Sequence, residues 1–231
     1  MKIKERLKKI WREFAVPVAV TALVLFTFRS AVADWNDVPT GSMKPTLIEG
    51  DRILVNKLAF GLRLPFTLSW ISRWDAPARG DVVVLFSPAP DGTRLVKRVV
   101  GVPKDEIEMK SNHLFVNGAE CEYGPLDEDT ISQIDESERR AHDFAEETLS
   151  GRKHPVMSSM SRAVERSFGP VTVPEGHFFV MGDNRDESAD SRVFGFVPED
   201  RIVGRATRVI FSLDRDRLYL PRGGRFFRAL P

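Results

Sequence analysis

The chain has 231 residues, enough for one or two domains with a hydrophobic core. Its 34 basic and 33 acidic side chains nearly cancel, which gives no support to a nucleic-acid partner, because such proteins carry a basic domain or stripe. The single cysteine, Cys121, excludes an intramolecular disulfide, and no Cys/His cluster has zinc-ligand spacing. We therefore expect no metal, no cofactor and a fold stabilised by packing alone.

The first 33 residues combine a basic start with an apolar run. Basic residues outnumber acidic ones before the run at 14–28, which is shorter than the roughly 20 residues needed to span hydrocarbon. Trp11 at one end and residues 30–33 at the other complete a span if Arg29 reaches the interface. The pattern predicts a single-pass anchor with its basic end in the cytoplasm and everything after Ala33 exported.

Two other interpretations fit parts of this segment. The basic start and the small-x-small sequence Ala31-Val32-Ala33 also match a cleavable signal peptide. A buried core helix is disfavoured because the segment lacks a polar face and cations dominate the preceding turns. The charge pattern favours the retained anchor, and the sequence alone leaves cleavage open.

Beyond Ser42 the apolar residues fall into short alternating blocks bounded by Gly, Pro and Asp, which is typical of strands. Asp91-Gly92 joins two blocks and predicts a hairpin, and Asn117-Gly118 predicts another turn. We therefore expect a mainly β fold: an antiparallel β core with hairpins, one N-terminal transmembrane helix and a polar, partly helical insertion. The expected strands lie at 52–57, 81–87, 93–100, 113–116, 176–181 and 205–211.

Two segments break the strand pattern. Residues 58–74 mix aromatic and apolar side chains with only Arg63 and Arg73 as charges, which suits either a membrane interface or a loop folded over the core. Residues 119–170 are polar and charged, and we expect an inserted, cap-like surface region, partly helical or mobile. The expected organisation is a basic stub and anchor at 1–33, a β domain at 34–118 plus 171–213, the insertion at 119–170 and a basic, solvated C-terminal tail at 214–231.

Ser42 follows Thr40-Gly41, where a glycine between two hydroxyl residues allows a sharp turn with an exposed amide. Taken alone, this is an ordinary loop. A serine nucleophile needs a base, and the four histidines lie in strand-like runs or in the polar insertion, which disfavours each of them. Lys97 is the alternative. Strand alternation places it with Leu95 and Val99 on an apolar face, where lost hydration lowers the pKa of the amine, whereas an edge-strand lysine would reach solvent.

Five sequence boxes resemble, in order, those of the type I signal peptidase (leader peptidase) family of Ser-Lys dyad serine proteases. The boxes are 42–47, 50–57, 79–84, 97–103 and 182–192, and the resemblance covers roughly 34–118 and 171–211. It implies that Ser42 is the nucleophile, Lys97 the general base, and the Thr40 hydroxyl with the Ser42 N–H the oxyanion hole. It also implies a lysine-orienting hydroxyl and a supporting ion pair in the last box, and shallow apolar pockets for small side chains. These further residues are Ser188, the pair Asp190 and Arg192, and the substrate-binding Val38, Pro39, Met43, Val84 and Val96.

The chain departs from the family pattern at two places. Lys104 follows Pro103 where the family usually has Gly, which puts a backbone conformation that favours Gly in doubt, and Glu187 stands where Asn is common. Neither position is expected to carry chemistry. The acid-rich stretch 183–190 lacks the Gly and Glu spacing of a calcium loop, so we expect no metal there.

The resemblance implies a membrane-bound serine endopeptidase that cleaves signal peptides from exported preproteins after a small-x-small site, through an acyl-enzyme. It implies the cytoplasmic (inner) membrane as location, with the catalytic domain on the exterior side. The expected partners are preprotein signal peptides and the lipid membrane, with no nucleic acid and no second copy of the chain. A dedicated Ser-Lys maturation peptidase of conjugation type and a catalytically silent, membrane-tethered binding module remain alternatives. Self-cleaving repressors share the dyad but carry a DNA-binding domain where this chain has an apolar segment.

Overall fold

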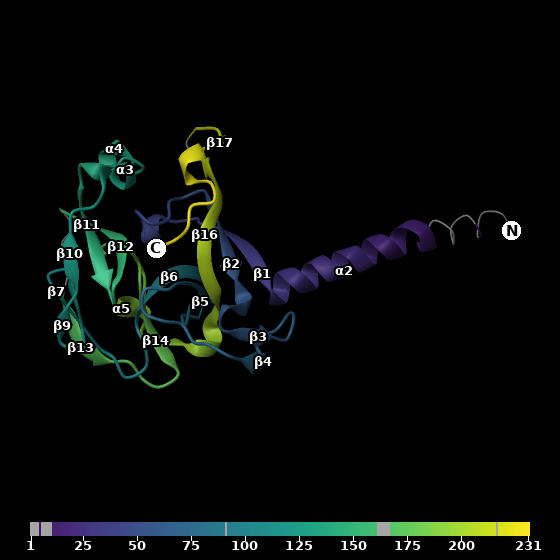
Figure 1. Ribbon diagram of the computed structural model, residues 1–231, viewed down its shortest axis with the longest axis horizontal. Coiled ribbons are helices and arrows are strands. Elements are labelled where there is room, and N and C mark those ends of the chain that lie inside the picture. The colour runs from purple at the N-terminus through teal and green to yellow at the C-terminus, as the bar shows by residue number, and fades with distance from the viewer. Residues whose placement is uncertain (1–4, 6–10, 91, 161–166, 216) are drawn as a thin grey trace.

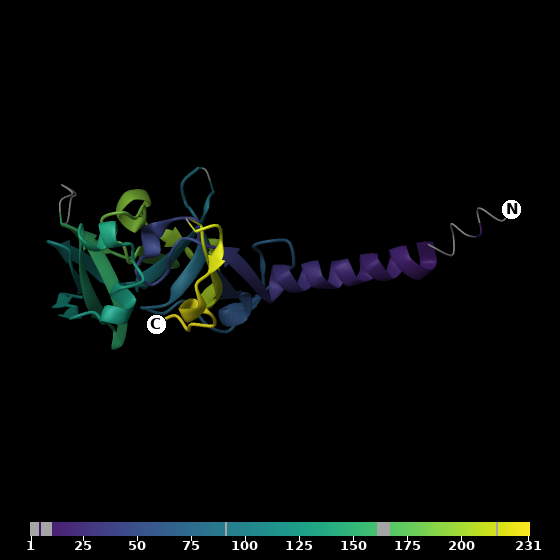
Figure 2. The ribbon, with the colours of Figure 1, turned by 90° about the horizontal axis from the view of Figure 1, so that it is seen from above.

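A long helix projects from a β domain in the computed structural model (Figure 1), which describes residue 5 and residues 11–90, 92–160, 167–215 and 217–231. Most of the expected basic stub lies outside the described residues. The helix runs without a break through the π-helical turn η1 (Trp11–Ala15) and α2 (Val16–Ala31), and Figure 2 shows it standing clear of the domain along its length. Its 21 residues are long and apolar enough to cross a membrane, since 21 residues at a rise of 1.5 Å each reach about 30 Å, the thickness of the hydrocarbon layer.

The helix enters the domain through a polar cluster at its C-terminal end. Arg29, in the last turn, donates to Asp34 at 2.7 Å and stacks over the ring of Trp35 at 4.0 Å. The next element, β1 (Ala33–Asp37), begins with Ala33 opposite Asn56 of β2 (Asp51–Asn56). The sequence Ala31-Val32-Ala33 is therefore held between the helix and the sheet, and the carbonyl of Val32 accepts from the Lys57 amide at 3.0 Å.

One antiparallel sheet organises the domain, in the order β1-β2-β16-β5-β6-β14-β15, with β17 paired to β16. The mainly β prediction is confirmed, and the two blocks on either side of Asp91-Gly92 pair as expected, although Asp91 itself lies outside the described residues. The further strands are β5 (Val82–Phe86), β6 (Arg94–Gly101), β14 (His177–Met181), β15 (Val197–Pro198), β16 (Ile202–Asp214) and β17 (Leu220–Pro221).

The core lies on both faces of β5. Successive strand residues point to opposite faces, so Val82 and Val84 join one apolar cluster while Val83 and Leu85 join another. All four side chains are almost fully buried. This explains why the strand is a continuous apolar run rather than an alternating one.

The region expected as a cap-like insertion contains more strand than the sequence analysis anticipated. The two short helices α3 (Glu128–Ile131) and α4 (Glu136–Arg139) are present, but an eight-residue hairpin, β11 (His142–Leu149) with β12 (Arg152–Ser159), dominates. Its turn is Ser150-Gly151, with φ angles of 50° and 77°, as two-residue hairpins require. The insertion also contains β9 (Ala119–Glu120), β10 (Glu122–Gly124) and the start of β13 (Phe168–Thr172). Strands β9 and β13 join β7 (Glu106–Lys110) and β8 (His113–Val116), which precede the insertion, in a second sheet on the left of Figure 1.

Some charged side chains of this hairpin are buried, although the sequence analysis placed the region on the surface. Glu147 is fully buried and pairs with Arg185 at 2.7 Å and with His154 at 3.2 Å. Burial raises the pKa of Glu147, but the Arg185 guanidinium and the neighbouring His154 outweigh burial and hold it well below its usual range. Pairing makes the burial tolerable, and composition alone cannot reveal a partner 38 residues away.

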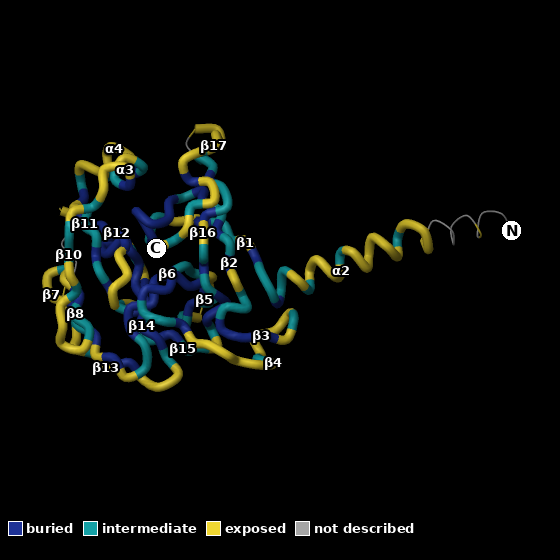
Figure 3. Tube along the Cα trace, viewed as in Figure 1, coloured by how far each residue is buried: buried dark blue, intermediate teal, exposed yellow. Residues whose placement is uncertain are grey.

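Residues 58–74 form a small hairpin at the foot of the membrane helix, with η3 (Lys57–Ala59), β3 (Gly61–Arg63) and β4 (Trp70–Arg73). The amide of Phe66 at its tip donates to Ser30 Oγ of α2 at 2.6 Å. Figure 3 shows that this hairpin and the helix are both largely exposed. The exposed apolar side chains of the hairpin are Leu64, Phe66, Leu68, Ile71 and Trp74.

The C-terminal residues are not the solvated end that the sequence analysis expected. Strand β17 pairs with β16, and after it the turn η5 (Gly223–Arg225) returns to the domain. Arg225 is 2% exposed and pairs with Asp51 of β2. Leu230 packs against the core cluster that contains Met43. The basic character of this segment therefore serves an internal ion pair.

Candidate active site

Ser42 lies in the turn η2 (Gly41–Met43), which is fixed on two sides. Met43 is buried in the core and its carbonyl accepts from Leu47 at 2.8 Å, which anchors the chain after the serine. On the other side, the Asn184 amide donates to the Ser42 carbonyl at 3.2 Å and the Asn184 side chain donates to the Gly41 carbonyl at 3.3 Å. The turn thus presents the Ser42 hydroxyl from a backbone with little freedom.

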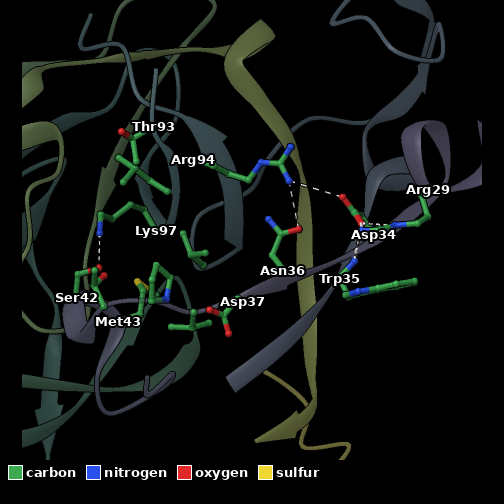
Figure 4. Close-up of a pocket in the computed structure, with 15 residues that line it drawn as sticks. Arg29, Asp34, Trp35, Asn36, Asp37, Ser42, Met43, Thr93, Arg94 and Lys97 are labelled. Carbon is green, nitrogen blue, oxygen red and sulfur yellow. Dashed lines mark hydrogen bonds and ion pairs between the residues drawn. The ribbon is translucent and has the colours of Figure 1, made fainter. Parts of the chain in front are cut away.

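Lys97 of β6 meets Ser42, as Figure 4 shows: its Nζ lies 2.6 Å from Ser42 Oγ. The lysine is only 2% exposed, and Val83, its partner across β5, is fully buried. Burial lowers the pKa of Lys97 to about 8, and the carboxylates of Asp190 and Asp183 oppose this only in part. At pH 7 about a tenth of such an amine is neutral, compared with a few in ten thousand for a free lysine.

A bidentate ion pair supports the lysine strand from the next position. Arg98 binds Asp183 through Nε at 2.9 Å and Nη2 at 2.8 Å, and Thr46 donates to the same carboxylate. Arg98 also donates to the Gly80 carbonyl at 2.7 Å. Because Asp183 follows Gly182 and Thr46 follows the Ser42 turn, this cluster ties β6, the serine turn and the last sequence box together.

The expected pair Asp190 and Arg192 is present at the start of α5 (Ser191–Phe194). Arg192 binds Asp190 through Nε at 2.8 Å and Nη2 at 2.7 Å, and the Gly182 amide donates to Asp190 at 2.9 Å. Burial raises the pKa of Asp190, but the Arg192 ion pair outweighs it and the pKa is lowered. The loop of the last box is therefore closed at its two ends by one carboxylate.

Ser188 lies beside the serine turn. Within the described residues no hydrogen bond joins its buried Oγ to Lys97 Nζ, and its hydroxyl instead helps to lower the pKa of Asp190. A Cβ built on Gly182 would overlap both Ser188 and the Ser42 carbonyl. Gly182 and Asn184 were not singled out in the sequence, because their importance depends on this close approach.

A cavity of about 410 Å³ opens beside Ser42 and Lys97. One wall is the stretch from Asn36 to Thr40 and the other is the beginning of β6, from Thr93 to Lys97. Of the residues expected to bind substrate, those that line the cavity are Val38, Pro39, Met43 and Val96. Val84, opposite Val96 and on the same sheet face, does not line it, since its side chain is fully buried in the core cluster. Thr40 lines the cavity and is exposed.

None of the four histidines lines this cavity in the structure as described. Among the described residues no three His, Cys, Asp or Glu side chains come together in a way that could hold a metal ion. Lys104, which replaces a usual glycine, adopts a φ of 75° with its side chain exposed. The backbone conformation that favours Gly is therefore kept there, at a cost of about 1–2 kcal/mol for a non-glycine residue.

Comparison with known proteins gives one consistent result. The family model described as "Signal peptidase, peptidase S26" matches residues 11–211. "Signal peptidase I" of Pseudomonas fluorescens is 36% identical over 221 residues, covering 90% of this chain and 75% of that protein. The protein of the same name from Pseudomonas aeruginosa is 37% identical over 209 residues, covering 85% and 70%. The crystal structure of a signal peptidase I from Enterococcus faecalis is 30% identical and aligns with a TM-score of 0.35, covering 58% of this chain and 98% of that one.

Proposed function

Since the chain belongs to the signal peptidase family, peptidase S26, we propose that it uses Ser42 and Lys97 as nucleophile and general base. The chain is a serine endopeptidase of the signal peptidase I type, and its substrates are the signal peptides of preproteins. One observation carries the assignment of roles: a buried amine with a pKa of about 8 lies 2.6 Å from a serine hydroxyl at the end of a cavity. This is the arrangement that an activated nucleophile requires.

The reaction follows from these groups. The neutral Nζ of Lys97 takes the Ser42 proton as Oγ attacks the scissile carbonyl, and the Ser42 N–H and the Thr40 hydroxyl stabilise the oxyanion. The protonated lysine then gives its proton to the leaving amine, which departs as the N-terminus of the mature protein. Water, deprotonated by the same lysine, attacks the acyl-enzyme and releases the signal peptide with a free carboxylate.

The free strand edges beside the cavity support binding of an extended peptide. Among the described residues β1 pairs only with β2, so its other edge has no partner strand. In β6, β14 pairs with residues from Arg98 to Gly101, which leaves the part before Lys97 unpaired on that side. Both edges line the cavity. We propose that the substrate lies between them as an added strand, with its small side chains against Val38 and Val96.

The apolar helix before the domain supports a location of this site at a membrane. We propose a single-pass protein of the cytoplasmic (inner) membrane with the domain on the exterior side, acting as a monomer. The anchor is proposed to stay in the mature protein, since Ala33 is paired in the sheet and Ala31 is buried. A small-x-small sequence held in this way offers no extended segment for cleavage.

A cleavage assay tests the assignment. Purified full-length protein is expected to cleave a panel of model preproteins after a small-x-small site, and Ser42→Ala and Lys97→Met should abolish cleavage. Lys104→Met is the matched control, because the Lys104 side chain is 81% exposed and does not line the cavity beside the dyad. Retained cleavage in Ser42→Ala would overturn the mechanism. Cleavage of only one preprotein would favour a dedicated maturation peptidase. Failure to cleave any preprotein would favour a binding module.

A further inference from the structure

A second cavity, which we call the helix-foot cavity, lies where α2 meets the β domain. Its volume is about 490 Å³, and it is bounded by Ser30 and Ala31 of the helix, by the tip of the β3–β4 hairpin and by the start of β6. Because Ala31 is the last residue of the membrane-crossing helix, the cavity lies at the level where the span leaves the hydrocarbon. It is separate from the dyad, since neither Ser42 nor Lys97 lines it.

The charge of the helix-foot cavity is strongly positive. Four cationic side chains line it, and no acidic side chain does so among the residues described; the four are Lys57, Arg63, Arg94 and Arg201. Arg63 is 6% exposed and donates to the Ile202 carbonyl at 2.6 Å, and Arg201 donates to the Ser87 carbonyl at 3.0 Å. Both acceptors are neutral backbone carbonyls, so neither hydrogen bond cancels a charge.

Nearby carboxylates do not balance these cations. Asp34 is shared by Arg29 at 2.7 Å, Lys57 at 3.5 Å and Arg94 at 3.7 Å. The acids near Arg63 are Glu199 and Asp200. Glu199 is already paired with Arg73 at 2.8 Å. In the described part of the chain, Nε and Nη1 of the buried Arg63 have no hydrogen-bond partner, and the guanidinium stacks over the Trp70 ring at 4.0 Å. Burial lowers the pKa of Arg63 although Asp200 and Glu199 oppose it. An anion in the cavity would supply the missing charge.

The cavity also has an apolar wall that a small free anion would not use. Phe66, Leu68 and Phe86 line it beside the cations, and Phe66 and Leu68 are exposed. The hairpin tip is held against the helix by the bond from the Phe66 amide to Ser30 Oγ. Cations next to exposed apolar side chains at the end of a membrane span complement a molecule with an anionic head and an acyl tail. A signal peptide, which begins with basic residues, does not match this charge.

We propose that the helix-foot cavity binds one anionic phospholipid, with its phosphate among Lys57, Arg63 and Arg201 and its acyl chains along Phe66, Leu68 and the end of α2. Lys57, Arg63 and Arg201 all line the cavity, and Lys57 Nζ, which also donates to the Arg29 and Ser30 carbonyls at 2.8 and 3.2 Å, lies at the end of α2. Bound there, the lipid holds the junction between α2 and the domain at the level of the headgroups. This site does not depend on the dyad chemistry.

Lipid counting tests the proposal directly. Delipidated full-length protein in nonionic detergent is titrated with phosphatidylglycerol and with phosphatidylcholine of the same acyl chains, and bound lipid is counted by native mass spectrometry. We expect one phosphatidylglycerol per chain, bound at least about tenfold more tightly than phosphatidylcholine. Lys57→Gln and Arg201→Gln should each weaken it about fivefold, and together about 25-fold, since each cation near a lipid surface has an effect of that size.

Matched controls distinguish a specific lipid site from a general attraction between basic side chains and anionic lipid. Lys104→Gln and Arg217→Gln remove cations whose side chains are 81% and 80% exposed away from the cavity, and neither should change lipid binding. A thermal unfolding midpoint equal to that of the unmodified chain shows that the cavity variants fold. Equal affinity for the two lipids, or equal weakening by the control variants, would refute a specific site. Binding of glycerol 1-phosphate as tightly as the lipid would refute the contribution of the apolar wall.

Discussion

The pH dependence of cleavage is the most direct consequence of the burial of Lys97. The base is the neutral amine, and a pKa of about 8 means that its neutral fraction is about 1% at pH 6, half at pH 8 and nine-tenths at pH 9. A solvated lysine would be only about 0.3% neutral at pH 8. We therefore expect kcat/KM to rise about tenfold per pH unit below pH 7, to bend near pH 8 and to level off above pH 9.

The assay is steady-state cleavage of a preprotein without titrating groups near its scissile bond, in detergent, from pH 5.5 to 10.5. Thermal unfolding at each pH shows the range over which the protein stays folded. A control substrate with an activated ester should report the same pH midpoint, because acylation of Ser42 uses the same base. A rise centred near pH 10.5 would refute a desolvated lysine. A bend near pH 6.5 would point to a histidine instead.

The remaining predictions concern stability and local packing. The unfolded state holds the Lys97 proton up to a higher pH than the folded state, so folding stability should increase by about 3 kcal/mol between pH 7 and pH 10.5; Lys97→Met should lose that pH-dependent increase, as measured by chemical denaturation of both proteins. Thr40→Val should lower kcat about 10²–10³-fold with little change in unfolding midpoint, whereas Thr40→Ser should keep most activity; equal activity of both variants would remove Thr40 from the oxyanion hole. Gly182→Ala should lower kcat/KM at least about tenfold because its methyl group would push Ser188 and the Ser42 carbonyl apart, whereas Gly124→Ala, with open space around it, should not; the two variants are compared in the same cleavage assay.

The sequence predicted the features that depend on local pattern. Alternation and turn residues located β2, β5, β6, β14 and most of β16 in the main sheet but not its edge strands β1, β15 and β17, and a long apolar run located the helix. The expected face for Lys97 followed from strand periodicity, and burial of the amine is found in the structure. At Lys104, where the family usually has Gly, the backbone keeps a positive φ at modest cost, and the side chain is exposed.

Features that depend on distant partners were beyond reach of the sequence. Glu147 and Arg225 read as surface charges because each charge is internal only through a partner elsewhere in the chain, Arg185 and Asp51 respectively. Val84 is expected by resemblance in a substrate pocket; it shares a sheet face with Val96, which lines the cavity, but its own side chain is fully buried in the core cluster behind it. The same holds for Gly182, whose lack of a side chain matters only because the Ser42 turn packs against it.

The buried ion pairs explain why the dyad distance is fixed although Ser42 lies in a loop. A buried pair contributes little net stability compared with apolar packing, but breaking one leaves an uncompensated charge, so the paired geometry is strongly specified. Two such pairs enclose the chain that follows Ser42: Arg98 with Asp183 on the Lys97 side, and Arg225 with Asp51 at the start of β2. The Thr46 carbonyl accepts from Arg225 at 3.0 Å, and its hydroxyl donates to Asp183, so one residue of the turn joins both pairs. The C-terminal segment thereby supports the position of a serine more than 170 residues earlier in the chain.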